Sequence, residues 1–412
     1  MELKKYKLGD VADIVNGATP STHNSENYDG SIIWITPKDL SGQKQKIIRR
    51  GQRNISEIGF NNCSAQMIPP YNILMSSRAP IGLLAINENE CCTNQGFKNL
   101  VLDKSICDTD YMYYYLQFHM KEIEALGSGT TFKEISKSAL QGIEIRLPDL
   151  EKQRDIAKCL SDLDRKIELN KQINDNLEVM AKQLYDYWFV QFDFPNEDGK
   201  PYKSSGGAMV WNDKLKREIP QGWSNGVLSD VANITMGQSP DGSSYNEDGE
   251  GIIFYQGSTD FGLRFPDIRQ YTTSPSRYAN KGDILMSVRA PVGALNIANN
   301  DCCIGRGLSA LSSKIGSMTH LYYLMNDFRL KFEGMNSAGT TFGSITKDEL
   351  FSLPVIIPTK SVISEFEQVC EPIFDKQMII GEEINALTKQ RDELLPLLMN
   401  GQASVNYHLS DD

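Results

Sequence analysis

An internal duplication constrains the fold of this chain more than any other feature of its sequence. Residues 73–82 read ILMSSRAPIG and residues 284–293 read ILMSVRAPVG, identical at eight of ten positions. LGDVADIVNGATPS (8–21) also matches LSDVANITMGQSPD (228–241), and GSGTTFKEISKSALQGIEIRLP (127–148) matches NSAGTTFGSITKDELFSLPVIIP (336–358). A period of about 210 residues is far longer than the ~20–50 residues of solenoid repeats. The 412-residue chain therefore contains a duplicated domain, and each copy must build its own core.

Each copy is predicted to combine short strands with one shorter helix. SIIWIT (31–36) and GIIFYQ (251–256) have strand composition, and the repeated ILMS segments run into Arg-Ala-Pro-x-Gly. Proline stops strand pairing there and glycine permits a positive φ, so a turn should follow. A helix is expected over 108–126 and again over 317–335. Each copy is therefore predicted to be a mixed α/β (α+β) domain.

A long helix is predicted after each copy, beginning just after Pro148 and Pro358. Apolar residues recur at alternating spacings of four and three, which is typical of a coiled coil. The predicted seams consist of Ile156, Leu160, Leu163, Ile167, Asn170, Asn174, Leu177, Ala181, Leu184 and Trp188, and of Phe366, Cys370, Ile373, Gln377, Ile380, Ile384, Leu387, Arg391, Leu394 and Leu398. The polar seam residues would cost stability but fix the register. The alternative is two amphipathic helices that pack separately, each on its own domain.

The order along the chain is domain, helix, linker, domain, helix. We predict a first domain over 1–150, a helix over 151–192, a linker over 193–217, a second domain over 218–360, a second helix over 361–400 and a tail over 401–412. The linker is rich in Gly, Pro, Ser and charge, so we expect a loop there. A rough two-fold relation between the copies would place the helices antiparallel, with one domain near each end of the rod.

Composition excludes several classes of protein. The net charge of −11 argues against nucleic acid at first, but residues 361–412 alone hold three basic and ten acidic residues, while 201–360 hold fifteen of each. No apolar run is long enough for a transmembrane helix, and the polar start MELKKYKLGD does not favour a secretory signal. The eight cysteines include no CxxC pair, so we expect reduced, buried thiols in a cytoplasmic protein.

Motifs for catalysis are missing or defective. IPPYN (68–72) is similar to the Asn/Asp-Pro-Pro-Tyr motif of amino-methyltransferases, but Ile68 cannot accept a hydrogen bond from a target amine. GSGTTF (127–132) is glycine-rich, yet no GxxxxGK[ST] phosphate-binding loop exists. The four histidines His23, His119, His320 and His408 show no motif partner. We therefore expect no enzymatic activity, no cofactor and no metal site.

A rod with a similar head at each end would hold two binding sites at a fixed spacing, which suits the regular repeat of double-stranded DNA. The heads differ most between 34–53, which is basic, and its counterpart 254–270. Cations, amides and hydroxyls supply phosphate and base contacts. The candidate DNA-binding residues are Lys38, Lys44, Lys46, Arg49, Arg50, Arg53, Arg78, Asn94, Gln95, Thr130 and Thr131 in the first head, and Gln256, Ser258, Thr259, Arg264, Arg269, Arg289, Arg306, Thr340 and Thr341 in the second.

For some of these candidates the sequence leaves a structural role open. Any single one of the cations could be a solvated surface charge. The four threonines could instead shape the turn into the next element through side-chain to backbone hydrogen bonds. Arg78 and Arg289 could tie the end of a strand to backbone carbonyls rather than face DNA. The two alternatives for the arginines differ in burial, so a structure can separate them.

The whole arrangement resembles the specificity subunits of Type I restriction-modification systems. The resemblance rests on the duplicated domains, on GTTFKEI and GTTFGSI before each helix, on LYDYWFVQFDFP (184–195) and on IPQGW (219–223). It implies two target-recognition domains separated by a long antiparallel two-helix coiled coil, which bind a bipartite, asymmetric DNA target. It also implies docking of methyltransferase subunits, two of them, with restriction subunits joining through these. Methylation, ATP hydrolysis and cleavage would belong to those partners.

Two other functions remain open on the sequence. A non-catalytic, two-headed coiled-coil adaptor between proteins would have the same architecture, and the acidic second helix fits either function. A stand-alone recognition fragment of a fused restriction-methylase is disfavoured, because both heads and both helices are present. The sequence does not give the target bases, the spacer length or the existence of a nuclease partner, since base preference depends on loop geometry.

Overall fold

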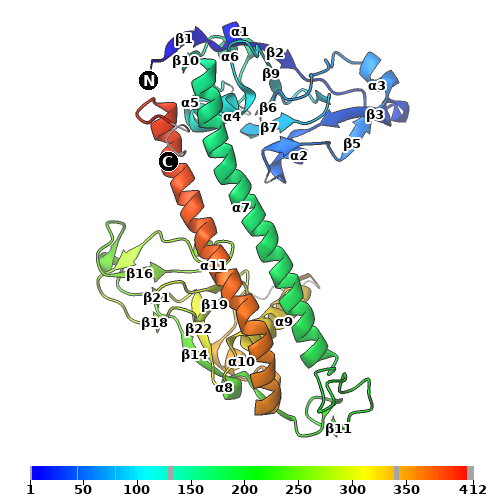
Figure 1. Cartoon of the computed structure of the whole chain (residues 1–412), viewed down its shortest axis with the longest axis vertical. Coiled ribbons are helices and arrows are strands. Elements are labelled where there is room, and N and C mark those ends of the chain that lie inside the picture. The colour runs from blue at the N-terminus through cyan, green and yellow to red at the C-terminus, as the bar shows by residue number, and fades with distance from the viewer. Residues whose placement is uncertain (1, 44, 79, 129–132, 338–342, 406–412) are drawn as a thin grey trace, which may run out of the picture. The chain divides into compact units, whose positions relative to one another are not determined.

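The computed structural model describes residues 2–43, 45–78, 80–128, 133–337 and 343–405. The chain divides into two compact units, Met1–Ile167 with Ala386–Asp412, and Glu168–Asn385. The boundaries fall inside the two long helices, α7 (Leu150–Tyr185) and α11 (Lys360–Met399) (Figure 1). Each unit therefore contains one globular domain and a part of both helices.

The domain of the first unit contains two main sheets. A five-stranded sheet has the order β2 (Ala12–Asn16), β9 (Lys98–Leu102), β6 (Ile73–Ser77), β7 (Ile81–Asn87), β4 (Ile47–Ile48). A three-stranded sheet has the order β5 (Arg53–Ile55), β3 (Tyr28–Ile35), β8 (Cys92–Thr93), and β1 (Lys4–Lys7) pairs with β10 (Glu144–Leu147). The short helices are α1 (Leu8–Val11), α2 (Pro37–Ser41), α3 (Glu57–Asn61), α4 (Thr109–Phe118), α5 (Met120–Ala125) and α6 (Lys137–Gln141).

The domain of the second unit repeats this plan. Its four-stranded sheet has the order β14 (Ala232–Met236), β22 (Leu308–Ser313), β19 (Ile284–Ser287), β20 (Leu295–Ile297). A five-stranded sheet has the order β15 (Tyr245–Asn246), β17 (Tyr271–Thr272), β16 (Ile252–Tyr255), β21 (Cys302–Ile304), β18 (Tyr278–Ala279), and β13 (Ser224–Val227) pairs with β23 (Pro354–Ile357). Its helices are α8 (Leu228–Val231), α9 (Met318–Ser337) and α10 (Lys347–Phe351), with a 3-10 turn, η4, over Ser258–Asp260. The predicted duplicated, mixed α/β fold is confirmed.

The repeated ILMS segment forms the same turn in both copies. Gly82 and Gly293 adopt φ values of 92° and 88°, a region that favours glycine, as the sequence predicts. Ser76 and Ser287 are buried, and each hydroxyl donates to the carbonyl of the motif proline. Each also accepts a hydrogen bond from the backbone amide one residue beyond the glycine. The motif is therefore part of the shared framework of the two domains.

In the second unit, α7 and α11 pack against each other in antiparallel directions. Asn170 Nδ2 donates to Glu383 Oε2 over 2.9 Å, and Gln377 Nε2 donates to Glu178 Oε2 over 2.9 Å. Residue numbers rise along α7 as they fall along α11, which is the signature of antiparallel pairing. The polar seam residues thus pair across the helices, in accord with a role in fixing the register.

In the first unit, the end of α11 packs into the core of the domain. Leu398 and Met399 belong to the same buried cluster as Ile156 and Leu160 of α7. All the predicted seam residues of both helices are buried or partly buried. The coiled coil predicted from the spacing is therefore confirmed, and the alternative of helices that pack only on their own domains is wrong.

The segment predicted as a loop after α7 contains ordered structure instead. The helix continues as a π-helix over Asp186–Val190, and β11 (Met209–Asn212) pairs with β12 (Arg217–Pro220). Phe194 stacks on Tyr202 and on Trp223, with ring centroids 4.6 and 5.1 Å apart. Composition rich in Gly, Pro and charge predicted a loop, but these aromatic side chains give the segment a small core of its own.

Candidate nucleic-acid interface

The basic segment of the first domain begins at a capped helix. Thr36 donates its hydroxyl to Asp39 over 2.7 Å, and Asp39 also accepts from the Thr36 amide over 2.8 Å, which fixes the start of α2. The cap leaves Lys38 exposed on the first turn. Lys38, Arg50 and Arg53 line one surface hollow of about 780 Å³. Among the described residues, no carboxylate pairs with Lys38 or Arg50, so both cations are open to a ligand.

Two arginines of this segment, Arg53 and Arg49, hold exposed ion pairs. Arg53 donates from Nε and Nη2 to Asp29, both over 3.1 Å, and lies 4.0 Å from the centre of the Tyr28 ring. The Arg53 hydrogen bonds hold the pKa of the Asp29 carboxyl below its usual range. Arg49 Nε lies 2.8 Å from Glu88 Oε2. Exposed pairs of this kind are weak, so the carboxylate can exchange for a phosphate.

Three further candidates of the first domain, Asn94, Gln95 and Arg78, lie next to the strands that both domains share. Asn94 accepts a hydrogen bond from the Gly96 amide over 2.9 Å, which shapes the turn after β8. Gln95 is exposed and its side-chain oxygen accepts from the Thr19 hydroxyl. Arg78 is half-buried. The structure therefore gives Asn94 a local role and leaves the Gln95 amide free to donate.

The second domain gathers three cations around a different hollow. Arg289, Arg306 and Lys347 line a surface hollow of about 420 Å³ beside α10. All three are exposed, and in the described part of the chain none is paired with a carboxylate. The exposure of Arg289 favours the DNA-facing alternative over a buried tie to carbonyl groups. This basic hollow has the chemistry to hold a phosphate.

Lys347 was not among the candidates taken from the sequence. It begins α10, directly after the cap residue Thr346, just as Lys137 begins α6 after Ser136. A lysine therefore recurs at the same position in both copies, following each GTTF segment. That recurrence is the signal that could have identified both lysines.

Around η4, the other candidates of the second domain lie on the surface. Asp260 accepts from the amides of Gln256 and Gly257 over 2.8 and 3.3 Å, which holds the segment in place. The side chains of Gln256 and Thr259 are exposed, and Ser258 is half-buried. Arg269 is exposed and lies 3.9 Å from Asp267. The bonded backbone thus presents Gln256 and Thr259 to solvent.

Two candidates point inward. Lys46 contacts Asp110 and Ser161, and Arg264 contacts Glu178 and Gln377. Since these cations already have buried or half-buried partners, they are poorly placed to contact DNA. Five further candidates lie outside the described residues: Lys44, Thr130, Thr131, Thr340 and Thr341.

Among the features weighed for catalysis and metal binding, the IPPYN segment supports a turn, and most of the cysteines are buried. In the IPPYN segment, Asn72 accepts from the Leu102 amide over 2.9 Å, so its side chain supports the turn. All eight cysteines are free, and burial raises the pKa of the Cys91 and Cys92 thiols to about 12. Among the described residues, no cluster of three potential metal ligands occurs, and no helix is long and apolar enough to cross a membrane.

Comparison with known proteins gives one consistent family. The family described as "Type I restriction modification DNA specificity domain" matches residues 1–179 and 220–393. The Type I restriction enzyme MjaIX specificity subunit of Methanocaldococcus jannaschii is 32% identical, over 97% of this chain and 93% of its own length. The HindI specificity subunit of Haemophilus influenzae is 25% identical, over 97% and 99%.

A solved structure shares the fold. The S subunit of a Type-I restriction-modification system from M. genitalium superposes with a TM-score of 0.62 and 17% identity, and the match covers 97% of this chain and 96% of that one. Both copies of the duplicated domain and both long helices are included in a match of this extent. The likeness at this identity concerns the fold.

Proposed function

This chain belongs to the Type I restriction-modification DNA specificity family, and from that premise we propose that it binds a split, asymmetric double-stranded DNA target, one half-site per domain. The proposal rests on one observation: the two domains share a fold but expose different basic side chains. Lys38 and Arg50 lie open in the first domain. The hollow of the second contains Arg306, which stands where the first copy has Gln95, beside Arg289 and Lys347, which recur in the first copy as Arg78 and Lys137. Different side chains on one frame would read different bases.

The test begins with the target itself. Adenine methylation mapped across the genome of cells that express the chain with its methyltransferase partner gives the motif. The purified complex is then titrated with a duplex that carries the motif and with a scrambled duplex, at several salt concentrations. We expect preference for the motif, and an affinity that falls steeply as salt rises, because phosphate contacts release counterions.

Variants then assign each hollow to a half-site. Arg50→Ala should relax or weaken recognition of one half of the motif, and Arg306→Ala the other half, by about 1–3 kcal/mol for a base contact. Lys214→Ala removes an exposed cation from the segment after α7 and serves as the control. Equal binding to motif and scrambled duplexes would contradict the proposal and favour the protein-protein adaptor.

We also propose that α7 docks the methyltransferase subunits, two per complex, and that restriction subunits join through them. Beside the seam, α7 and the π-helix that continues it carry a second apolar stripe formed by Leu169, Ile173, Met180 and Tyr187, which meets the seam at Leu184. All of these except the half-buried Leu184 are exposed. Spacings of four, seven, four and three place them on one helix face, which suits packing against partner helices.

Aspartate substitutions in the apolar stripe test whether it binds the methyltransferase subunits. Met180→Asp and Tyr187→Asp should prevent co-purification with the methyltransferase while the chain stays folded, because a carboxylate would be buried without a partner. Trp211→Asp places the same charge on an exposed aromatic residue of the β11–β12 hairpin, and should leave the complex intact. Retention of the complex by both stripe variants would rule out this surface.

Catalysis is assigned to the partners. We propose that the chain alone performs no methyl transfer and holds no cofactor, since its relatives are named as specificity subunits. Incubation of the purified chain with DNA and labelled S-adenosylmethionine should leave the DNA unlabelled, and labelling should require the methyltransferase subunit. Label transferred by the chain alone would overturn this part of the proposal.

A further inference from the structure

The two segments that differ most between the copies each direct one cation inward. The side chains of Lys46 and Arg264 are 17% and 8% exposed, whereas those of Arg49 and Arg269, in the same segments, are 79% and 58% exposed. A buried, paired cation cannot turn to a phosphate without leaving its carboxylate partner uncompensated. These two cations are therefore poorly placed to contact DNA directly.

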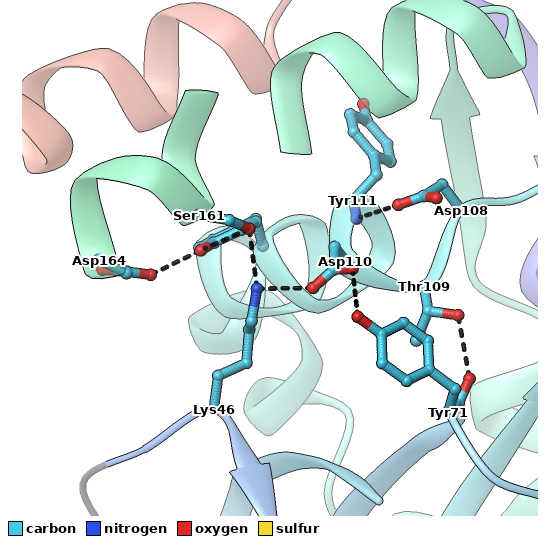
Figure 2. A network of polar contacts seen from close by, with 9 residues as sticks. Lys46, Tyr71, Asp108, Thr109, Asp110, Tyr111, Ser161 and Asp164 are labelled. Atoms are coloured by element: carbon cyan, nitrogen blue, oxygen red, sulfur yellow. Dashed lines mark hydrogen bonds and ion pairs between the residues drawn. The ribbon is translucent and has the colours of Figure 1, made fainter. Parts of the chain in front are cut away.

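In the first unit, Lys46 joins its segment to two helices. Its Nζ donates to Asp110 Oδ1 on α4 over 2.6 Å and to Ser161 Oγ on α7 over 2.8 Å (Figure 2). The same ammonium group lies 5.0 Å from the centre of the Tyr114 ring. Asp110 accepts a further hydrogen bond from the Tyr71 hydroxyl over 3.0 Å. Lys46 immediately precedes β4, so these contacts fix the end of the variable segment.

The contacts continue to the second long helix. The Tyr114 hydroxyl donates to Asp164 Oδ2 on α7 over 2.6 Å. Arg391 Nη1 on α11 donates to Asp164 Oδ1 over 3.0 Å. A connected polar network therefore links the variable segment of the first domain, through α4, to the parts of α7 and α11 in the same unit. Networks of this kind gain rigidity when every member is satisfied.

The second unit contains a corresponding arrangement around Arg264. Its Nη1 lies 3.6 Å from Glu178 Oε2 on α7, and its Nη2 donates to Gln377 Oε1 on α11 over 3.2 Å. The guanidinium lies 5.0 Å from the ring centre of Phe374 and 5.5 Å from that of Tyr322. An arginine that combines ion pairing with stacking is held firmly in one orientation.

The two arrangements use equivalent tyrosine pairs. Tyr113 and Tyr114 meet edge to face at 5.5 Å, and Tyr322 and Tyr323 do so at 5.3 Å. The hydroxyls of Tyr114 and Tyr323 both donate to a carboxylate on α7, over 2.6 and 3.2 Å. One cation from each variable segment lies over a ring of its pair, Lys46 over Tyr114 and Arg264 over Tyr322. The arrangement recurs although the cations themselves, a lysine and an arginine, differ.

We propose that Lys46 and Arg264 are positioning residues for DNA recognition, each fixing the variable segment of its own domain to the long helices. This inference rests on the proposed function and deepens it. The tether keeps the neighbouring exposed groups, such as Lys38 and Arg50, in the geometry that reads the target. Loss of a tether should weaken binding of the correct sequence without removing a phosphate contact.

Salt dependence separates a tether from a direct contact. The complex with methyltransferase is prepared with Lys46→Met, Asp110→Asn, the double variant, and Lys38→Met as the exposed control. Affinity for the motif duplex mapped above is measured from low to high NaCl. Loss of one phosphate contact lowers the slope of log K against log salt by about 0.9, whereas loss of a tether leaves the slope unchanged.

We expect Lys38→Met to lower the slope of log K against log salt. Lys46→Met should keep the wild-type slope but bind the motif duplex roughly three- to tenfold more weakly. Asp110→Asn should act in the same direction, and the double variant should be no worse than the stronger single one. Ser161→Ala, which removes one acceptor without leaving a buried charge, covers the case in which Lys46→Met fails to fold. A slope lowered by Lys46→Met, together with wild-type binding by Asp110→Asn and Ser161→Ala, would overturn the inference.

A second measurement needs no DNA. Hydrogen exchange of residues 45–48 in the intact complex should be faster in Lys46→Met and Ser161→Ala, and unchanged in Lys38→Met. Unchanged exchange in all three variants would overturn the tether while leaving sequence-specific binding by the wild-type complex in place. Loss of any preference for the motif duplex by the wild-type complex would instead contradict the proposed function, and the tether with it.

Discussion

His320 is a buried residue whose charge state should influence the stability of the second unit. It is 2% exposed, its Nδ1 has no partner among the described residues, and its ring meets that of Phe189 edge to face at 4.6 Å. Burial lowers the pKa of His320 to about 3. The corresponding position of the first copy, Tyr111, is also buried with its hydroxyl unpartnered by any described group. The first turn of α9, like that of α4 in the first copy, therefore packs against apolar surroundings.

The lowered pKa predicts a loss of stability in acid. Below pH ~6.5 His320 is protonated in the unfolded chain but stays neutral in the folded chain. The free energy of unfolding therefore falls as pH decreases toward 3. The slope from this group reaches up to about 1.4 kcal/mol per pH unit. His320→Leu should therefore show a smaller difference in unfolding free energy between pH 7 and pH 5, measured by urea unfolding. His23→Ala, at an exposed site, should keep the wild-type difference, and equal pH dependence of all three chains would contradict this account.

At the scale of the element, the seam between α7 and α11 contains polar residues of two kinds. Asn170 is buried and bonded to Glu383. Asn174, one turn later, is equally buried, but its Oδ1 has no partner among the described groups. A bonded seam amide fixes the register at little cost, whereas an unbonded one loses its hydration without compensation.

The two asparagines should therefore respond differently to leucine. Asn174→Leu is expected to raise the free energy of unfolding by about 1–2 kcal/mol, because it removes an unsatisfied buried oxygen and adds apolar contact. Asn170→Leu should give no such gain, because it removes a hydrogen bond. Chemical denaturation of both variants under identical conditions measures the contrast. A stabilisation of the same size in both would show that the Glu383 contact contributes nothing.

At the scale of the whole molecule, the first compact unit is assembled from distant parts of the chain, whereas the second is one continuous stretch, Glu168–Asn385. The first unit combines Met1–Ile167 with Ala386–Asp412, and Leu398 and Met399 lie in the same apolar cluster as residues of α4. The core of the first domain thus includes residues of α11, which lie far along the chain from α4. Such non-local contacts also favour slow folding.

Truncation tests whether the first domain needs these residues. A chain that ends at Asn385 loses the α11 residues buried in the first unit, and should show faster hydrogen exchange in α4 and α5 and easier proteolysis of the first domain. A chain that ends at Val405 keeps every described residue and should behave like the full-length chain. Equal protection of α4 in both truncated chains would show that the first domain is stable without the last part of α11.

The sequence predicted the framework because repetition and periodicity are local signals. The 210-residue match located the two domains, and the four-three spacing located the two helices and their seam. The sequence did not predict that the segment after α7 is folded, because the contact between Phe194 and Trp223 joins residues on either side of a turn-rich stretch. It also missed Lys347, whose importance depends on the arginines that lie beside it.

The sequence by itself determined the duplication, the helix lengths and the set of cations that a DNA-binding head could use. Only the tertiary structure decided which of those cations face solvent and which face the helices. Lys46 and Arg50 have the same charge and lie four residues apart, yet one lies over Tyr114 and the other is exposed. Charge and spacing are the same whether a side chain points in or out. The direction is set by partners such as Asp110 and Glu178, which only folding brings to those cations.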